Sequence, residues 1–233
     1  MFEVRALLGH IGYNFWCDKP RTDVHYGYST RLRFDPEVYK RLVKRAARAG
    51  FNMIILDLGD GIEWESHPEI TVENPLKRES LRELLKFARD NGVEPIPKLN
   101  FSTVHDIWLG QYERMIGTER YHQVCSELIT EAFELFDRPR FFHIGMDEET
   151  LGHHTGLGLE YVVLRLNNEW VRAVRRFNDD VRRLGAQART GTARCTTAAR
   201  RASALPAGVR GLPVSLRLSS ALILQVDPFR PIP

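Results

Sequence analysis

The chain has 233 residues, of which 43% are apolar and 27% charged, and its formal net charge is +3. This composition excludes a fibrous or globally disordered chain and permits one domain with a sizeable core. A complete (β/α)8 barrel usually needs about 250 residues, so a barrel built from this chain is expected to be incomplete.

The chain begins with a strand, a helix and a second strand. Residues 4–8 form a short apolar run typical of a buried strand. Asp35 supplies a capping carboxylate and Pro36 the first turn of a helix that Gly50 ends. Residues 53–56 follow at once as a continuous apolar strand, the kind found in parallel sheets. The apolar stripe expected to bury this helix comprises Val38, Leu42, Ala46 and Ala49.

The same alternation continues through two further strands. Apolar spacing predicts a helix over 81–88 and another over 121–135, and strands follow them at 93–99 and 140–145. Apolar residues at steps of three or four then predict a long helix over 159–184. We therefore expect an α/β fold of about four parallel strand–helix units, which is half of a (β/α)8 TIM barrel, followed by an irregular C-terminal tail.

The composition changes abruptly after residue 185. A fifth strand is expected near residue 187, but residues 186–233 instead contain seven arginines, one acidic residue and no Lys, Glu, His, Asn, Tyr, Trp or Met. We therefore divide the chain into a half-barrel at 1–185 and an Ala/Arg/Pro-rich tail. Such a switch is typical of another reading frame, and a natural disordered linker is the alternative. Residues 221–224 could still pair as an edge strand.

The charges and the cysteines of the chain argue against several kinds of partner and structural site. The chain before residue 186 holds 26 basic and 29 acidic residues, which is a poor footprint for nucleic acid. Cys17, Cys125 and Cys195 are widely spaced and form no CxxC pattern, so neither a disulfide framework nor a structural zinc site is expected. The start lacks a signal-peptide pattern and no apolar stretch approaches about 18 residues, so we expect a cytoplasmic protein without a membrane partner.

Polar and aromatic side chains follow each predicted strand. In parallel α/β folds, function gathers at the carboxyl ends of the strands. Tryptophan beside carboxylates and amides suits a sugar, because an apolar ring face stacks on the indole while the hydroxyls need directional partners. Trp16 is either a sugar platform or a lid on the core. The other candidate site residues are Asp60, Trp64, Asn100, His105, Trp108, His143, Asp147 and Glu148.

Two adjacent acids, Asp147 and Glu148, end the fourth strand. Neighbouring positions there point in different directions, so the two carboxyl groups can serve different atoms of one substrate. Glycoside cleavage needs an acid that protonates the leaving oxygen and a second group that attacks or stabilises the oxocarbenium-like centre. The pair fits that chemistry. The alternative is an acidic cluster that merely favours the dipole of the following helix.

Three segments resemble one enzyme family. The stretch FFHIGMDEE at 141–149 resembles the His-x-Gly-Gly-Asp-Glu signature of family 20 glycoside hydrolases, the β-N-acetylhexosaminidases, with Met146 where the second Gly is expected. The stretch FNMIILDLGDGIEW at 51–64 resembles the second strand of that family. The stretch IPKLNFSTVH at 96–105 resembles its third, with Asn100 in place of an expected Asp.

The resemblance covers residues 1–185 in order and implies the N-terminal half of a TIM-barrel glycoside hydrolase. It makes Glu148 the general acid/base and Asp147 the partner of the substrate's 2-acetamido group, which itself attacks in a substrate-assisted, retaining reaction. A carbohydrate is the implied partner, and no cofactor or metal is implied. The residues implied to line the sugar site are Asp60, Trp64, Asn100, His105 and Trp108, with His143 in support.

Two other functions stay open from the sequence. An open half-barrel is also compatible with a non-catalytic carbohydrate-binding or interaction remnant, which could self-associate through its unpaired sheet edges. A metal-dependent barrel hydrolase is the second alternative, although no HxH or HExxH spacing supports it. Its ligands would come from His10, Asp57, His105, His143 and Asp147.

Overall fold

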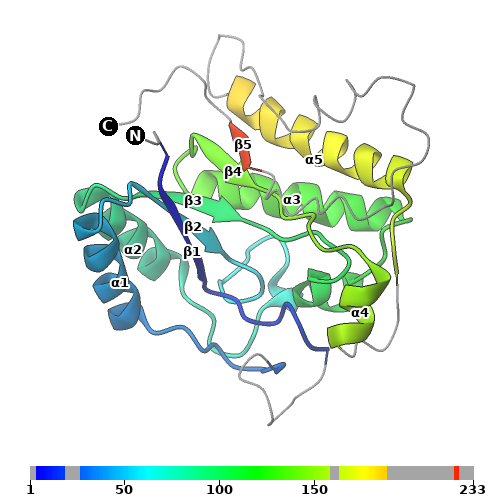
Figure 1. The fold of residues 1–233 in the computed structure, drawn as a ribbon, viewed down its shortest axis with the longest axis horizontal. Helices are drawn as coiled ribbons and strands as arrows, with labels where there is room; N and C mark the ends of the chain where they lie inside the picture. Colours follow the sequence, from blue (N-terminus) through cyan, green and yellow to red (C-terminus); the bar gives the residue numbers. More distant parts are fainter. Residues whose placement is uncertain (1–3, 19–26, 158–162, 188–222, 226–233) are drawn as a thin grey trace.

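The computed structural model describes residues 4–18, 27–157, 163–187 and 223–225. Four parallel strands alternate with helices, and a fifth strand joins the sheet antiparallel to the fourth, in the order β1-β2-β3-β4-β5. The sheet is open rather than closed into a barrel (Figure 1). The strands are β1 (Ala6–His10), β2 (Met53–Asp57), β3 (Glu94–Lys98), β4 (Phe141–His143) and β5 (Ile223–Gln225).

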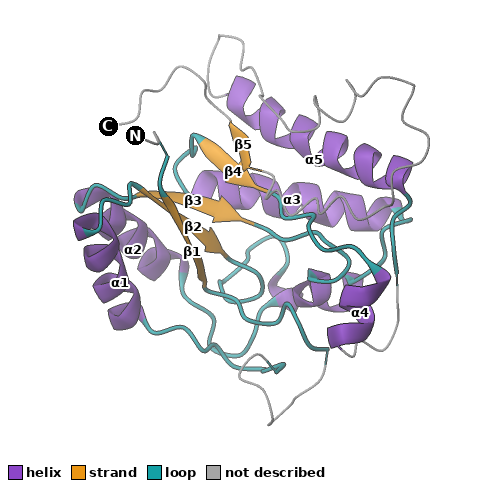
Figure 2. Cartoon of the chain, in the orientation of Figure 1, coloured by secondary structure: helices purple, strands orange, loops and turns teal. Residues whose placement is uncertain are grey.

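The helices form two groups beside the sheet. Helices α1 and α2 lie together next to β1 and β2, while α3 and α5 lie together next to β4 (Figures 1 and 2). The short α4 lies near the loops that follow the strands (Figure 1). No helix among the described residues is long and apolar enough to cross a membrane. The helices are α1 (Pro36–Arg48), α2 (Arg78–Asp90), α3 (Glu119–Leu135), α4 (Leu151–Leu157) and α5 (Asn167–Gln187), with 3-10 turns η1 (Pro68–Ile70) and η2 (Asp106–Tyr112).

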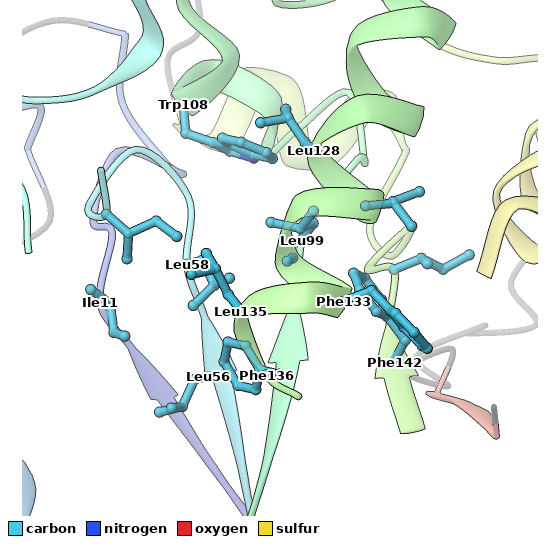
Figure 3. Close-up of a cluster of buried hydrophobic side chains, with 14 of the residues drawn as sticks. Ile11, Leu56, Leu58, Leu99, Trp108, Leu128, Phe133, Leu135, Phe136 and Phe142 are labelled. Carbon is cyan, nitrogen blue, oxygen red and sulfur yellow. The ribbon is translucent and has the colours of Figure 1, made fainter. Parts of the chain in front are cut away.

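The two faces of the sheet are covered differently. Ile54, Leu56 and Phe142 point into the main core, which lies between the sheet and the helices. Figure 3 shows Leu99 and Phe133 at the junction of the strands with α3. On the opposite face Met53, Ile55 and Ile96 form a smaller apolar cluster. This alternation follows from the two-residue period of a strand and explains why the strands read as continuous apolar runs.

The expected helix over 159–184 is wrong in its first part. Leu159 lies outside the described residues, residues 163–166 are not helical, and α5 begins at Asn167. The backbone N–H of Leu166 donates to the Glu169 carboxylate at 2.7 Å and so caps the helix start. A separate helix, α4, precedes this break. The apolar spacing alone did not reveal the break because the extended residues include Arg165, whose burial depends on a distant partner.

Two other expectations need correction. The first strand is displaced by two residues from 4–8 to 6–10. Helix α1 buries Tyr39, Val43 and Ala46, whereas Val38 and Leu42 are 49% and 36% exposed and Ala49 is also exposed. The cap itself is confirmed, because the Asp35 side chain accepts from the N–H groups of residues 37 and 38. The buried face is therefore rotated from the predicted one, and an apolar flank remains uncovered.

The predictions for the tail are tested only in part. Helix α5 extends to Gln187, where a fifth parallel strand was expected, and residues 223–225 form the antiparallel edge strand β5. This outcome confirms the strand pairing expected near 221–224. The remaining tail residues lie outside the described ranges, so the domain boundary and the change of reading frame stay predictions. Among the described strands β1 has one neighbour, and self-association through that edge also stays a prediction.

Two glycines allow the loops that follow β1 and β2 to pack closely against each other. A Cβ on Gly61 would lie 2.5 Å from the backbone nitrogen of Gly12, and a Cβ on Gly12 would lie 2.5 Å from the carbonyl oxygen of Leu58. We expect Gly61→Ala to lower the free energy of unfolding by about 3 kcal/mol, because backbone cannot move aside as a side chain can. Gly117→Ala is the matched control, since its Cβ would meet nothing within 4 Å. Equal urea denaturation midpoints for the two variants would contradict this close packing.

Candidate active site at the carboxyl end of the sheet

The turn after β4 has an unusual backbone. Gly145, Met146 and Glu148 all have positive φ, at 66°, 71° and 61°. For residues with a side chain this conformation is strained, and such strain clusters at functional sites. Met146 is 3% exposed, and its carbonyl oxygen accepts from the indole N–H of Trp170 at 3.0 Å, so packing holds the turn in place. The position where a second glycine was expected thus keeps a glycine-like backbone.

Asp147 is held by two residues of the loop that follows β3. The side-chain amide nitrogen of Asn100 lies 3.3 Å from Asp147 Oδ1 and donates to it. The hydroxyl of Ser102 donates to the carbonyl oxygen of Asp147. Asp147 itself is half-buried, whereas Asn100 is 3% exposed. Asn100 was predicted to line the sugar site, and the structure places it against the acid instead.

Glu148 is joined to His105 from the loop after β3. Glu148 Oε2 lies 3.0 Å from His105 Nε2, and His105 Nδ1 lies 3.2 Å from the carbonyl oxygen of Phe15. The carbonyl can only accept, so Nδ1 carries a hydrogen. The contact between Glu148 and Nε2 then needs one more proton, either on the carboxyl or on the imidazole. The sequence predicted both residues, and the structure brings them into direct contact.

The electrostatics of Glu148 favour its charged form. The hydrogen bond from His105 lowers the pKa of Glu148, with smaller help from the charges of His153 and Lys98, while burial opposes the shift. The Glu148 side chain is 45% exposed. A general acid needs the opposite shift, which enclosure in an apolar pocket produces. In this open arrangement Glu148 therefore favours its carboxylate form.

This assignment predicts the titration of Glu148. In His105→Phe the donor is lost, so the Glu148 carboxyl should titrate at higher pH than in the unchanged protein, as followed by carboxyl ¹³C NMR. A lowered folded-state pKa adds stability above the unfolded pKa and loses it as pH falls, so His105→Phe should also flatten the acid limb of stability. His153→Ala is the comparison, because its ring nitrogen is 3.7 Å from Glu148. An equal or larger shift in His153→Ala would contradict the pairing.

The third acid of the motif has a structural role. The Glu149 side chain is 5% exposed and forms an ion pair with Arg165, which is 2% exposed. Its Oε1 also accepts from the backbone N–H of Thr103 at 3.0 Å. Burial raises the pKa of Glu149, and Arg165 opposes that shift. Glu149 thus fixes the turn against the loop after β3.

A row of four polar residues crosses the sheet at the level of its carboxyl end. The strand register aligns His10 with Asp57, Asp57 with Lys98 and Lys98 with His143. Lys98 Nζ lies 2.6 Å from Asp57 Oδ2, and their side chains are 6% and 1% exposed. His10 Nδ1 lies 3.7 Å from the same oxygen. Lys98 was missing from the predicted site, since a lysine ending a strand is usually read as solvated.

His143 completes this row and lies beneath Asp147. Its Nδ1 accepts from the backbone N–H of Gly145 at 3.0 Å, and the side chain is buried. Burial, together with the charge of Lys98, lowers the pKa of His143 to about 3, while Asp147 opposes the shift. The ring is therefore neutral at physiological pH and keeps its hydrogen on Nε2. His143 supports the turn through its bond with Gly145, and its predicted place beside the sugar stays a prediction.

The structure corrects the predicted aromatic platforms. Trp64 and Trp108 are both 1% exposed and belong to the main core. Their indole N–H groups donate to the carbonyl oxygens of Gly59 at 2.9 Å and Asn100 at 2.8 Å. Neither ring can stack on a sugar in this arrangement. A tryptophan near a strand end is equally suited to closing the core, and the sequence cannot distinguish the two.

Trp16 packs against two histidines of the candidate site. It is partly exposed, and its ring packs edge-on against His10 at 5.2 Å and His105 at 6.5 Å between centroids. His105 is the residue that holds Glu148. The sequence left Trp16 open between a core lid and a sugar platform; it packs against the main core and is partly exposed, so both readings stay predictions.

Asp60 belongs to a different environment. It is 4% exposed, accepts from the Asn14 side-chain nitrogen at 2.5 Å, and has a pKa raised by burial to about 7. Among the described residues no hydrogen bond or ion pair links Asp60 to Asp147 or Glu148. The structure therefore does not bring this predicted substrate-binding residue into direct contact with the pair.

The arrangement of the described side chains bears on the alternative of a metal site. Within the described ranges no group of three or more His, Cys, Asp or Glu side chains is arranged to hold a metal ion. Asp57, one of the residues considered for such a site, is instead paired with Lys98. A cation in that position would compete with the lysine ammonium group.

Comparisons with known proteins identify the fold. A scan of models of known protein families gave no match, and a search of curated proteins gave none. Among solved structures, the N-acetyl-β-hexosaminidase of Streptomyces plicatus in complex with Thio-NAglucal matches 78% of this chain and 37% of its own, with 16% identity and a TM-score of 0.54. The fold is that of part of a family 20 glycoside hydrolase barrel.

Two further solved structures match the fold of this chain. The family 20 exo-β-N-acetylglucosaminidase of Vibrio harveyi in complex with N-acetylglucosamine matches 78% of this chain and 34% of its own, with 16% identity and a TM-score of 0.53. The Flavobacterium johnsoniae chitobiase matches 65% and 28%, with 19% identity and a TM-score of 0.52. The matched region thus spans about a third of the length of these enzymes, and the expected fold is confirmed.

Proposed function

We propose that the end of β4 is the catalytic site of a glycoside hydrolase of the β-N-acetylhexosaminidase type. The observation that carries the proposal is the pairing of each acid with its own partner, Asp147 with Asn100 and Glu148 with His105. Adjacent acids with different partners can hold different protonation states. The likeness to carbohydrate-cleaving enzymes of the same fold supports this assignment.

In the proposed reaction the Glu148 carboxyl group donates its proton to the glycosidic oxygen as the bond from that oxygen to C1 breaks. The carbonyl oxygen of the substrate's 2-acetamido group attacks C1 from the opposite face and forms a cyclic oxazolinium ion. Asp147 accepts the acetamido N–H and stabilises the positive charge. Water then opens the ring while Glu148 acts as the base, so the configuration at C1 is retained.

A second candidate function is carbohydrate binding without turnover. The lowered pKa of Glu148 favours it, because an exposed carboxylate is a weak proton donor at neutral pH. The burial of Trp64 and Trp108 leaves Trp16 and Trp170 partly exposed, and the Trp170 indole N–H is already bound to the carbonyl oxygen of Met146. Completion of the barrel by further strand–helix units would enclose Glu148 and raise its pKa. The two functions therefore differ in whether the pocket around Glu148 is closed.

The test compares two aryl glycosides that differ only at C2. We expect hydrolysis of an aryl β-N-acetylglucosaminide and at least about 100-fold slower hydrolysis of the matching aryl β-glucoside, whose 2-hydroxyl cannot form the cyclic ion. Equal rates on the two would reject substrate-assisted cleavage. Binding of N-acetylglucosamine without turnover of either substrate would favour the binding function. Loss of activity with chelator, restored by zinc or manganese, would favour a metal-dependent hydrolase.

A further inference from the structure

Asn100 has a fixed orientation at the base of the site. Its Oδ1 accepts from the backbone N–H of Ser102 at 3.1 Å, and that N–H can only donate. The amide nitrogen of Asn100 must therefore face Asp147 Oδ1, 3.3 Å away. The carbonyl oxygen of Asn100 is held as well, because it accepts from the indole N–H of Trp108 at 2.8 Å.

The turn after β4 packs against Asn100 from the other side. A Cβ on Gly145 would lie 2.2 Å from Asn100 Oδ1, so the absence of a side chain at residue 145 lets the turn rest directly on the amide. Asn100 is 3% exposed and cannot turn toward solvent without breaking these contacts. Ser102 adds a second link, since its hydroxyl donates to the backbone carbonyl of Asp147. The side chain of Asp147 thus rests on a preformed donor.

We propose that Asn100 is a positioning residue that fixes the Asp147 carboxylate through its amide N–H. A carboxyl group here could still accept from Ser102 with one oxygen. Its second oxygen would then face Asp147 Oδ1, and two acceptors at that distance need a shared proton. Position 100 thereby sets the charge of the site.

The other ionisable groups around Asp147 do not supply that proton. His143 beneath it is neutral, with its Nδ1 occupied by Gly145. Lys98 is paired with Asp57, and Glu149 with Arg165. Glu148 is oriented toward His105. The hydrogen bond from Asn100 is therefore the direct contact through which residue 100 acts on the acid.

The test is a four-member cycle of Asn100→Asp, Asp147→Asn, both together and the unchanged protein, with urea unfolding measured from pH 3.5 to 7.5. At pH 7 the single variant Asn100→Asp should raise the unfolding equilibrium constant at least about tenfold. In Asn100→Asp the carboxyl groups of residues 100 and 147 share a proton, so the folded-state pKa of this pair is raised. The stability that the shared proton contributes is full below the unfolded pKa and is lost as pH rises through the folded-state pKa. The double variant restores one acid and one amide and should recover most of the loss.

The remaining outcomes of the unfolding cycle either support or contradict the positioning role of Asn100. A loss that is the same whether residue 147 is aspartate or asparagine, or no loss at pH 7, would overturn the proposal. If Asn100→Asp does not fold at pH 7, folding at pH 4 together with folding of the double variant at pH 7 supports it. Failure of both variants to fold under these conditions overturns it, since Asn100 would then be needed for packing alone.

The catalytic meaning of this role rests on the proposed function. In an active protein, Asn100→Asp should move the acid limb of kcat/KM upward by about one pH unit, because the proton held by the acid pair must leave before Asp147 can act. Absence of turnover in the unchanged protein would reject the proposed function while leaving the unfolding cycle to decide the positioning role. An unmoved acid limb in an active variant would overturn the inference.

Discussion

Glu148→Gln is expected to lower kcat for an aryl N-acetylglucosaminide by at least about 100-fold while leaving sugar binding largely unchanged. Glutamine preserves the shape of the side chain and its contact with His105, but it cannot donate the proton that the leaving oxygen needs. Glu83→Gln on the exposed side of α2 is the matched control. Turnover by Glu148→Gln equal to that of the control would remove Glu148 from the mechanism.

The leaving group separates loss of proton donation from general damage to the site. An aryl oxygen that is already a weak base needs little protonation, so the defect of Glu148→Gln should shrink as the phenol becomes more acidic. A defect of constant size across a series of substituted phenols would instead indicate misfolding or lost binding. The rates of departure of at least four phenols, measured under saturating substrate, distinguish the two outcomes.

Lys98→Met is expected to lower the free energy of unfolding by about 3 to 5 kcal/mol, the largest effect on stability that we predict. The change leaves Asp57, which is 1% exposed, charged and without its lysine partner. His10 is too far away, at 3.7 Å, to replace the lysine with a short hydrogen bond. Urea denaturation with a two-state analysis measures the loss.

The double variant Lys98→Met with Asp57→Leu provides the control for the buried pair. Removing both charges leaves apolar groups of similar size, so stability should return to within about 1.5 kcal/mol of the unchanged protein. A loss in the double variant as large as in Lys98→Met would show that packing, and not the unpaired charge, is responsible. A loss below about 1 kcal/mol in Lys98→Met would show that Asp57 finds another partner.

The sequence was sufficient to predict the strands and the acid pair because both depend on local patterns. A continuous apolar run after Gly50 predicted β2, and a proline-marked segment after Gly92 predicted β3. The end of β4 placed Asp147 and Glu148 at the carboxyl edge. Parallel strands bring those ends together regardless of side-chain detail. The contact between His105 and Glu148 depends on a loop conformation that no local pattern encodes.

The predictions that were wrong concern residues whose burial depends on partners far away in the sequence. Arg165 interrupts the expected helix because it reaches Glu149 in the core, and that partner is visible only in three dimensions. Trp64 and Trp108 carry the amphipathic character of sugar platforms but find carbonyl partners inside the core. The predicted stripe of α1 is rotated because two neighbouring apolar stripes compete, and the one with Tyr39 and Val43 faces the sheet. Lys98 was missed because its neutralising partner lies on β2.

The open sheet and the exposed Glu148 have a common consequence for activity. The chain matches about a third of the length of the enzymes that share its fold, and Glu148 has a lowered pKa in this arrangement. A pocket closed by further strand–helix units would both cover the acid and raise its pKa. Resequencing the gene across the codons for residues 181–233 would reveal whether another frame continues with such units.

The most direct test of the proposed site is the affinity of a bicyclic thiazoline sugar, measured by calorimetry on the unchanged chain and on Asp147→Asn. This compound mimics the cyclic ion formed when the acetamido group attacks C1. We predict binding at least about 100-fold tighter than N-acetylglucosamine, with that advantage lost in Asp147→Asn. Equal affinity for the two sugars, or an advantage that persists in Asp147→Asn, would contradict a catalytic site at the end of β4.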